Sequence, residues 1–288
     1  MPDPVTRTLD VPGAVLSYDV RGDLQDRPVL LMIGSPMGAS GFPTLASHFT
    51  DRTVVTYDPR GVERSTRTDG SGELSPDDHA ADLATLIESL DVGPVDVFAS
   101  SGGAVNAIAL LARRPDLVNK VIAHEPPLAS LVPDSEAALK ACEDIHQTYQ
   151  RDGMGPAMAK FISIVSYEGE IPADYTDQPA PDPAMFGLPT EDDGSRDDAL
   201  LGQNLRRCTS YLPDFDALGR SAGQLVIGVG EESANQLAAR GGKAVAERLG
   251  LTPEVFPSNH GGFLGDEYGM PGQPAEFAVK LREVLAGR

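Results

Sequence analysis

Residues 95–104 read VDVFASSGGA, and this stretch decides the fold. The apolar, β-branched start predicts a buried strand, and the two serines and two glycines predict a very sharp turn. The run that continues to Arg113 predicts a helix. A strand, a tight turn and a helix in this order lift the residue at the apex clear of the backbone, where a base can reach it.

Ser101 is the candidate nucleophile of this turn. The strand and the helix almost touch there, so the residues two before and two after the nucleophile must be small. Ser101 has Ala99 and Gly103 at these positions, whereas Ser100 would have the bulky Phe98 at the first of them. The alternative is a glycine-rich turn that binds phosphate or nothing, although the chain has no Gly-Lys-Ser or Gly-Lys-Thr sequence.

Strand-like and helix-like segments alternate along most of the chain, which predicts an α/β fold with a parallel sheet and right-handed crossovers. The predicted strands are two within residues 5–20, joined at 12–13, and 28–33, 53–57, 95–100, 118–123, 224–229 and 253–256. The predicted helices are 42–49, 75–90, 104–113, 135–150, 156–165, 237–249 and 274–285.

Residues 128–222 break this alternation, because they show helical patterns but no clear strand. A stretch of this length is too long for an ordinary connection. We interpret it as a helical cap inserted between the sixth and seventh strands of a core made of residues 1–127 and 223–288. Its larger apolar residues are candidates for a substrate chamber or for the cap's own core: Met154, Met158, Phe161, Tyr167, Met185 and Phe186.

Composition excludes several classes of function. The 288 residues carry a net charge of −20, which disfavours binding to nucleic acids and to anionic membranes. There is no apolar run of about 18 residues, and residues 1–5 show no secretory signal. Cys142 and Cys208 form no disulfide framework or metal-binding pattern, so a reducing, cytoplasmic location is expected.

His260 is the candidate general base among the five histidines. It lies in a glycine-containing loop after the last predicted strand, where an imidazole can reach over the end of the sheet. His48, His79 and His146 occur in helical patterns with polar neighbours and are expected at the surface. The role of His124 is left open. No pair of histidines has the spacing of a metal site, so a metal enzyme is not expected.

Four motifs in order resemble those of the α/β-hydrolase fold family, over nearly the whole chain. They are Gly-Ser-Pro at 34–36, with Ile33 where the family usually has His; Asp-Pro-Arg-Gly at 58–61; Ala-Ser-Ser-Gly-Gly at 99–103, for the usual Gly-x-Ser-x-Gly; and His-Gly at 260–261. The resemblance implies a mostly parallel eight-stranded sheet flanked by helices, with an inserted helical cap. It also implies a small-molecule substrate and no cofactor.

The resemblance assigns roles to five positions, of which the acid is discussed separately. Ser101 would be the nucleophile and His260 its general base and later acid. The backbone N–H groups of Ser35 and Gly102 would stabilise the oxyanion, typically by about 3 kcal/mol each. A serine at this position disfavours the family's dehalogenases and epoxide hydrolases, which use a carboxylate nucleophile.

The acid that should support His260 is not at its usual place. The family places an Asp after the seventh strand, where this chain has Ser233. Some family members carry the acid after the preceding strand, and Glu125 lies there. Glu231 and Glu232 are the alternatives, and a catalytic pair without an acid is a third possibility. Glu125 would otherwise pair with an arginine at the base of the cap, such as Arg60.

These features predict a hydrolase of carboxylic esters or related acyl bonds, with a Ser-His-Glu triad, an acyl-enzyme intermediate and a small, partly apolar substrate. The alternatives are acyl transfer, amide or peptide cleavage, C–C hydrolysis or cofactor-free perhydrolysis at the same site, or a non-catalytic ligand-binding protein of the same fold. A strongly anionic substrate would need a local cation such as Arg60, Arg206 or Arg207. The sequence predicts no oligomeric state.

Overall fold

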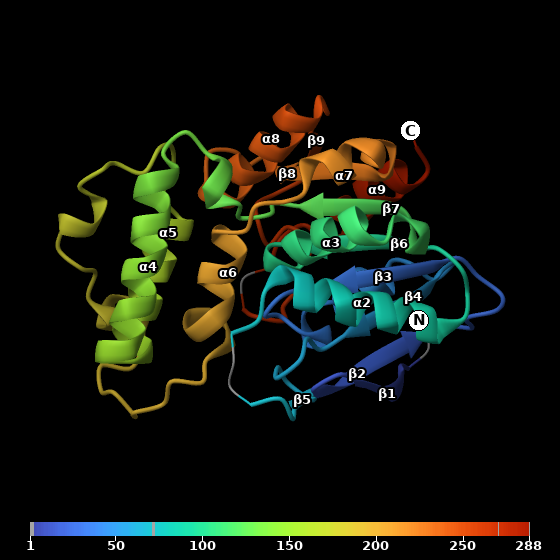
Figure 1. The fold of residues 1–288 in the computed structure, drawn as a ribbon, viewed down its shortest axis with the longest axis horizontal. Helices are drawn as coiled ribbons and strands as arrows, with labels where there is room; N and C mark the ends of the chain where they lie inside the picture. Colours follow the sequence, from blue (N-terminus) through green and yellow to red (C-terminus); the bar gives the residue numbers. More distant parts are fainter. Residues whose placement is uncertain (1–2, 71–72, 270, 288) are drawn as a thin grey trace.

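A twisted sheet runs through the computed structural model, with helices on both of its faces (Figure 1). The structure describes residues 3–70, 73–269 and 271–287, so part of the stretch searched for a secretory signal, residues 1–2, lies outside it. The strands are β1 (Val5–Val11), β2 (Ala14–Arg21), β3 (Val29–Ile33), β4 (Thr53–Tyr57), β5 (Thr66–Arg67), β6 (Val95–Ser100), β7 (Val118–His124), β8 (Leu225–Gly230) and β9 (Glu254–Phe256).

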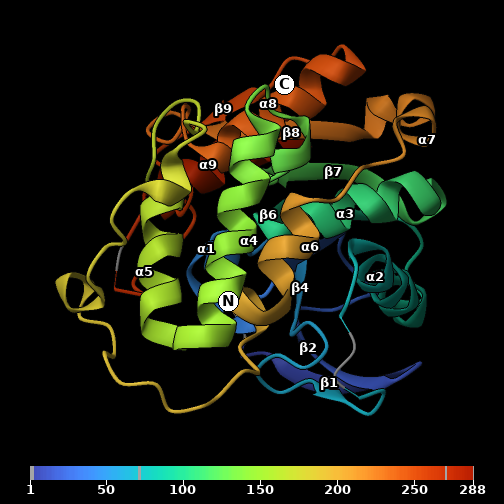
Figure 2. The same ribbon diagram turned by 60° about the vertical axis from the view of Figure 1, so that its left-hand side comes forward.

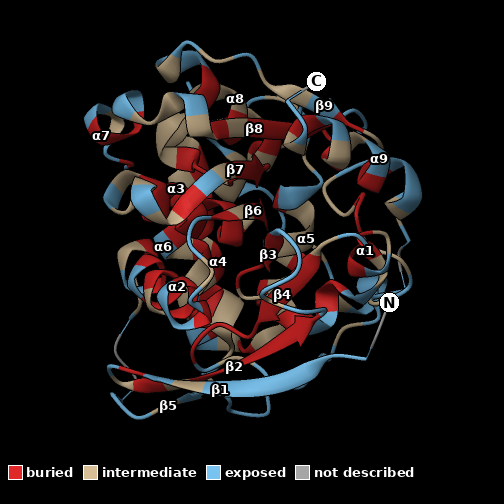
Figure 3. Cartoon of the chain, turned by 90° about the vertical axis from the view of Figure 1, so that its right-hand side faces the viewer, coloured by how far each residue is buried: buried red, intermediate tan, exposed pale blue. Residues whose placement is uncertain are grey.

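The strand order is β1-β2-β4-β3-β6-β7-β8-β9. Pairing is parallel from β4 to β9 and antiparallel between β1, β2 and β4, so the predicted mostly parallel sheet of eight strands is confirmed. The two-residue β5, which pairs with β2, is a ninth strand that the sequence did not predict, because two residues are too few for a periodic pattern. In Figure 3 the central strands are buried, whereas β1 is largely exposed at the edge.

Helices cover both faces of the sheet, because both faces carry apolar side chains that must be buried. On one face, α2, α3, α7 and α8 pack on the central strands, and on the other face α1 and α9 enclose a cluster of phenylalanines. Their bounds are α1 (Pro43–Ser47), α2 (Pro76–Leu90), α3 (Gly102–Arg113), α7 (Phe215–Arg220), α8 (Leu237–Leu249) and α9 (Pro274–Leu285). A capping box between Ser75 and Asp78 fixes the start of α2.

Most of the segment between β7 and β8 lies beyond the carboxyl ends of the parallel strands (Figures 1 and 2), whereas its last helix, α7, packs back on the face of the sheet. These two strands are the sixth and seventh when the short β5 is left out. The segment contains α4 (Ser135–Asp152), α5 (Met154–Val165), the π-helical turn η6 (Leu200–Asn204) and α6 (Leu205–Thr209). Residues 172–198, predicted as an irregular loop, contain only two short 3₁₀ turns, η4 (Tyr175–Asp177) and η5 (Pro183–Phe186).

This segment has an apolar core of its own, built around Ile145, Tyr149 and Leu201. Four of the six larger apolar residues noted in the sequence pack against this core: Met154, Met158, Phe161 and Tyr167. Met185 is 80 % exposed and Phe186 is 40 % exposed, so these two line no chamber. Among the described helices, none is long and apolar enough to cross a membrane.

Candidate active site

Ser101 lies at the apex of the turn between β6 and α3, in a backbone conformation that a non-glycine residue rarely adopts. Its φ is 57° and its ψ is −129°. The N–H of Ser101 donates to the carbonyl oxygen of His124 at 3.0 Å, which ties the turn to the end of β7. Its hydroxyl does not cap α3, although Ser101 is the residue just before the helix. The strained turn therefore presents a hydroxyl that is not used to cap the helix.

Gly103 shows why the turn needs small residues. A Cβ atom on Gly103 would lie 2.5 Å from the carbonyl oxygen of Ile33 and 2.9 Å from the backbone of Gly34. The first turn of α3 is thus packed directly on the end of β3. The close approach that the sequence predicted around Ser101 is present.

Ser35 and Gly102 lie against each other beside this turn. A Cβ on Gly102 would collide with the carbonyl oxygen of Ser35. Gly102 is the first residue of α3, where backbone N–H groups have no partner within the helix. Neither its N–H nor that of Ser35 donates a hydrogen bond to any other described residue. Two adjacent unused N–H donors next to a hydroxyl form an arrangement that can bind an oxyanion.

Glu125 is fully buried at the end of β7, with a left-handed φ of 49°. One carboxylate oxygen accepts hydrogen bonds from the N–H of Gly230 at 2.7 Å and from the hydroxyl of Ser233 at 2.6 Å. The other oxygen lies 2.6 Å from Nδ1 of His260. Ser233, at the position where the family usually has its acid, therefore donates to a carboxylate from the neighbouring strand.

The ionised form of Glu125 is favoured despite its burial. Burial alone would raise the pKa of this carboxyl above its ordinary value of 4.5. In the acidic range where this carboxyl titrates, the hydrogen bond from His260, Coulombic attraction to His124 and His260, and the hydrogen bond from Ser233 outweigh burial and lower the pKa to about 2. Glu125 is therefore a buried carboxylate at neutral pH, held in one orientation by three donors.

This pKa predicts a pH-dependent contribution to stability. Because the folded pKa lies below the unfolded value, Glu125 stabilises the fold above about pH 4.5 and loses that effect as the pH falls toward 2. The full effect is about 3 kcal/mol. We expect the difference in unfolding free energy between the wild type and Glu125→Gln to shrink by this amount between pH 7 and pH 2, as measured by denaturant titration. A difference that is constant over this range would contradict the assignment.

His260 uses one ring nitrogen for Glu125, and the other has no hydrogen-bond partner in the part of the chain that the structure describes. Since a carboxylate only accepts, Nδ1 donates this hydrogen bond, and in a neutral ring Nε2 would then be the acceptor. The side chain is 39 % exposed, so it is accessible to a substrate. Within the described residues, no hydrogen bond joins His260 to the hydroxyl of Ser101. The structure thus brings Glu125 and His260 into contact and places Ser101 at the same edge of the sheet.

The other candidate partners lie elsewhere. Glu231 and Glu232 are exposed, and the side-chain contacts of Glu232 are long ones, of 3.4 Å, to Ser258 and Gln273. Arg60 does not approach Glu125. Its guanidinium instead pairs with Asp82, in the middle of α2, with Nε at 2.7 Å, and with Asp69.

Two of the remaining histidines are buried, and for one of them the prediction was wrong. His79 is buried, not at the surface, because it lies four and seven residues before Leu83 and Leu86 on the apolar face of α2. His124 is enclosed by four phenylalanine rings, with its ring centre 6.2 Å from that of His260. Burial lowers the pKa of His124 to about 4, so it is neutral at pH 7.

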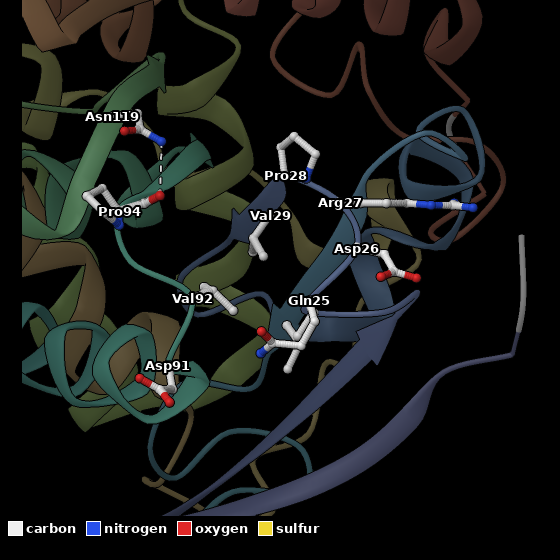
Figure 4. Close-up of a pocket in the computed structure, with 10 residues that line it drawn as sticks. Gln25, Asp26, Arg27, Pro28, Val29, Asp91, Val92, Pro94 and Asn119 are labelled. Carbon is white, nitrogen blue, oxygen red and sulfur yellow. Dashed lines mark hydrogen bonds between the residues drawn. The ribbon is translucent and has the colours of Figure 1, made fainter.

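A surface hollow of about 380 Å³ lies at the other end of the strands from these residues, by the amino ends of β3 and β6 (Figure 4). Its lining includes Pro28, Val29, Pro94 and Asn119 but no serine, histidine or cysteine. Among the described residues, no group of three or more His, Cys, Asp or Glu side chains is placed to hold a metal ion. The candidate nucleophile Ser101 and the candidate base His260 both lie at the carboxyl ends of the parallel strands, away from this hollow.

Sequence reasoning missed one residue that reaches this site. Asn204, at the end of η6, donates from its side-chain amide to the hydroxyl of Ser35 at 2.7 Å. No local pattern marks Asn204, because its contact depends on how a segment about 170 residues away in the chain folds over the sheet.

Comparisons with known proteins agree with the fold described above. Residues 27–153 match the family model described as the alpha/beta hydrolase fold. The chain is 30 % identical over 284 residues to the uncharacterized hydrolase YraK of Bacillus subtilis, covering 96 % of this chain and 95 % of that protein. Over 121 residues it is also 30 % identical to 2-(acetamidomethylene)succinate hydrolase of Mesorhizobium japonicum, covering 41 % of this chain and 42 % of that one.

Solved structures share the fold over almost the whole chain. A thermophilic esterase from Thermogutta terrifontis superposes with a TM-score of 0.67 at 20 % identity, covering 99 % of both chains. The enol-lactonase from Burkholderia xenovorans superposes with a TM-score of 0.64 at 16 % identity, covering 97 % of this chain and 100 % of that one. With the full-length relative and the matching motifs, these findings show that the chain belongs to the family of α/β-fold hydrolases.

Proposed function

We propose that this protein is a serine esterase that cleaves a carboxylic ester, or a related acyl bond, of a small, partly apolar substrate. One observation carries the proposal: the buried carboxylate of Glu125 holds the His260 ring at the edge of the sheet where the strained turn presents Ser101. A hydroxyl is a weak nucleophile until a base removes its proton, and His260 leaves a free nitrogen for that purpose.

The proposed reaction has two halves. The Ser101 hydroxyl attacks the ester carbonyl while Nε2 of His260 takes its proton, and Glu125 stabilises the resulting imidazolium. The N–H groups of Ser35 and Gly102 bind the negative oxygen of the tetrahedral intermediate. The intermediate then collapses, and His260 returns the proton to the departing alcohol. A water molecule, activated by the same imidazole, releases the acid from Ser101.

The contact between Ser101 and His260 is expected to form with substrate in place. Catalytic hydrogen bonds are often long or poorly aligned in unliganded enzymes and tighten in the complex. The exposure of His260 leaves its ring accessible to substrate.

We further propose that residues 128–222 act as the cap over a core of residues 1–127 and 223–288. Helices α4, α5 and α6 of this segment lie beyond the carboxyl ends of the strands, whereas α7 packs on the sheet. Most of the residues of one separate apolar cluster come from the segment, and Leu237 of α8 joins them. Such a cover would exclude water from the reacting groups.

The charges near the site favour a neutral substrate. Each arginine that was a candidate for binding an anion is already paired with carboxylates. Arg60 pairs with Asp82 and Asp69, and Arg206 and Arg207 both pair with Glu73. A strongly anionic substrate would have to displace these partners.

Steady-state hydrolysis of short p-nitrophenyl esters tests the proposal. We expect turnover of acetate to hexanoate esters that follows the concentration of folded protein. Addition of alcohols or amines as acyl acceptors separates hydrolysis from acyl transfer, because transfer would divert the acyl group to the acceptor. Absence of turnover with any acyl substrate would favour a non-catalytic binding protein.

A further inference from the structure

Asn204 lies between the two residues whose N–H groups are the proposed oxyanion donors. Its side-chain nitrogen donates to the hydroxyl of Ser35 at 2.7 Å. Its side-chain oxygen lies against Gly102, since a Cβ on Gly102 would be 2.8 Å from it. One amide from the segment between β7 and β8 therefore touches both sides of the proposed oxyanion hole.

The orientation of this amide is fixed from the other side by Cys208. The buried Sγ of Cys208, one turn further along, lies 3.6 Å from the Asn204 oxygen and 4.0 Å from the carbonyl oxygen of Gly102. A thiol is a weak donor, so it favours the orientation in which the amide oxygen faces Cys208 and the nitrogen faces Ser35. Asn204 also ends a π-helical turn, a rare geometry that is frequent at functional sites.

We propose that Asn204 is a positioning residue of the oxyanion hole, an inference that rests on the proposed esterase function. It holds the loop that carries Ser35 against the start of α3, so that the N–H groups of Ser35 and Gly102 converge on one point. Oxyanion donors act only when they are aimed at the place where charge develops, and a displacement of about 1 Å can cost about 100-fold in rate. The hole is therefore complete only while η6 is seated on the core.

The test compares Asn204→Ala with Gln203→Ala, which changes the neighbouring residue of the same π-helical turn. The side chain of Gln203 contacts Arg67, at 3.5 Å, and not the proposed site. For p-nitrophenyl butyrate we expect Asn204→Ala to lower kcat about 10- to 100-fold with KM changed less than about threefold. For Gln203→Ala, we expect both kcat and KM to stay within about twofold of the wild-type values.

A readout specific to the oxyanion separates positioning from general destabilisation. A short-chain trifluoromethyl ketone forms a hemiketal oxyanion on a reactive serine, whereas the matching methyl ketone binds without forming one. We expect Asn204→Ala to weaken inhibition by the trifluoromethyl ketone by the same factor as it lowers kcat, and to leave inhibition by the methyl ketone unchanged. Asn204→Asp keeps the shape but puts a negative charge beside the hole, and is expected to lose more activity than Asn204→Ala.

Ser35→Ala gives a second route that leaves the helical segment intact. It removes the hydroxyl that Asn204 contacts but keeps the backbone N–H. We expect it to reproduce the loss seen in Asn204→Ala, and the double variant to be no worse than either single one, because both remove the same contact. If Asn204→Ala does not fold, Ser35→Ala alone tests whether this contact positions the oxyanion hole.

Three results would overturn the inference. The first is wild-type kcat in Asn204→Ala, and the second is equal weakening of both ketones, which indicates general damage to the site. The third is fully additive losses in the double variant. These results in an active wild type leave the esterase proposal standing. If the wild type turns over no ester, the esterase proposal itself is wrong, and the inference about Asn204 is wrong with it.

Discussion

Ser101→Ala is expected to lower kcat/KM for p-nitrophenyl esters by about 10⁴-fold or more. The substitution removes the only atom that can carry the acyl group in the proposed mechanism. What remains is the stabilisation of charge by the oxyanion donors, with water as a poor substitute for the nucleophile. Stability is expected to change little, because the hydroxyl caps no helix and the methylene group is kept. Steady-state kinetics with a denaturation curve for each variant measure both effects.

Ser100→Ala is the matched control for this prediction. Ser100 is the adjacent serine, is buried, and lies 3.4 Å from Nδ1 of His124 and not at the apex of the turn. Its loss is expected to reduce activity less than about tenfold. If Ser100→Ala were inactive while Ser101→Ala kept its turnover, the nucleophile would be misassigned.

Glu125→Gln is expected to lower kcat by about 10²- to 10⁴-fold. The neutral amide keeps the size of the side chain but cannot stabilise an imidazolium. Its NH₂ group would also face Nδ1 of His260, which favours the tautomer whose Nε2 carries a proton and cannot accept one from Ser101. KM is expected to change much less than kcat, since Glu125 is buried away from substrate.

Glu232→Gln and Glu231→Gln test the alternative acids directly. Both side chains are exposed in the loop after β8, and neither contacts His260 within the described residues. We expect each variant to keep activity within about twofold of the wild type. The reverse ranking, with Glu232→Gln inactive and Glu125→Gln active, would show that the loop rearranges to supply the acid.

Features with local determinants were predictable from sequence. The bounds of α8 agree with its apolar periodicity, and the start of α2 follows from Ser75 and Pro76. The turn at Ser101 was readable because its requirement for small residues is also local. That Ser101, Glu125 and His260 share one edge follows from a parallel sheet, in which the strands end on the same side.

Features that depend on contacts between distant segments were not predictable. The sequence shows that Ser233 replaces the expected acid. It does not show that Ser233 donates to Glu125, because that hydrogen bond joins the ends of two neighbouring strands, between residues that are 108 positions apart. The position of Asn204 depends on the path of the whole segment before it. His79 is different: its spacing to the leucines of α2 already placed it on the apolar face, and its polar neighbours outweighed that signal.

The central claim is that His260 activates the hydroxyl of Ser101, and covalent labelling by a fluorophosphonate tests it most directly. The serine oxygen bonds to phosphorus as fluoride leaves, and intact mass with peptide mapping locates the adduct. We predict one adduct per chain, on Ser101, that is absent in Ser101→Ala and forms at least about 100-fold more slowly in His260→Ala. Folded wild-type protein that stays unlabelled, or that carries the adduct on another residue, would contradict the account.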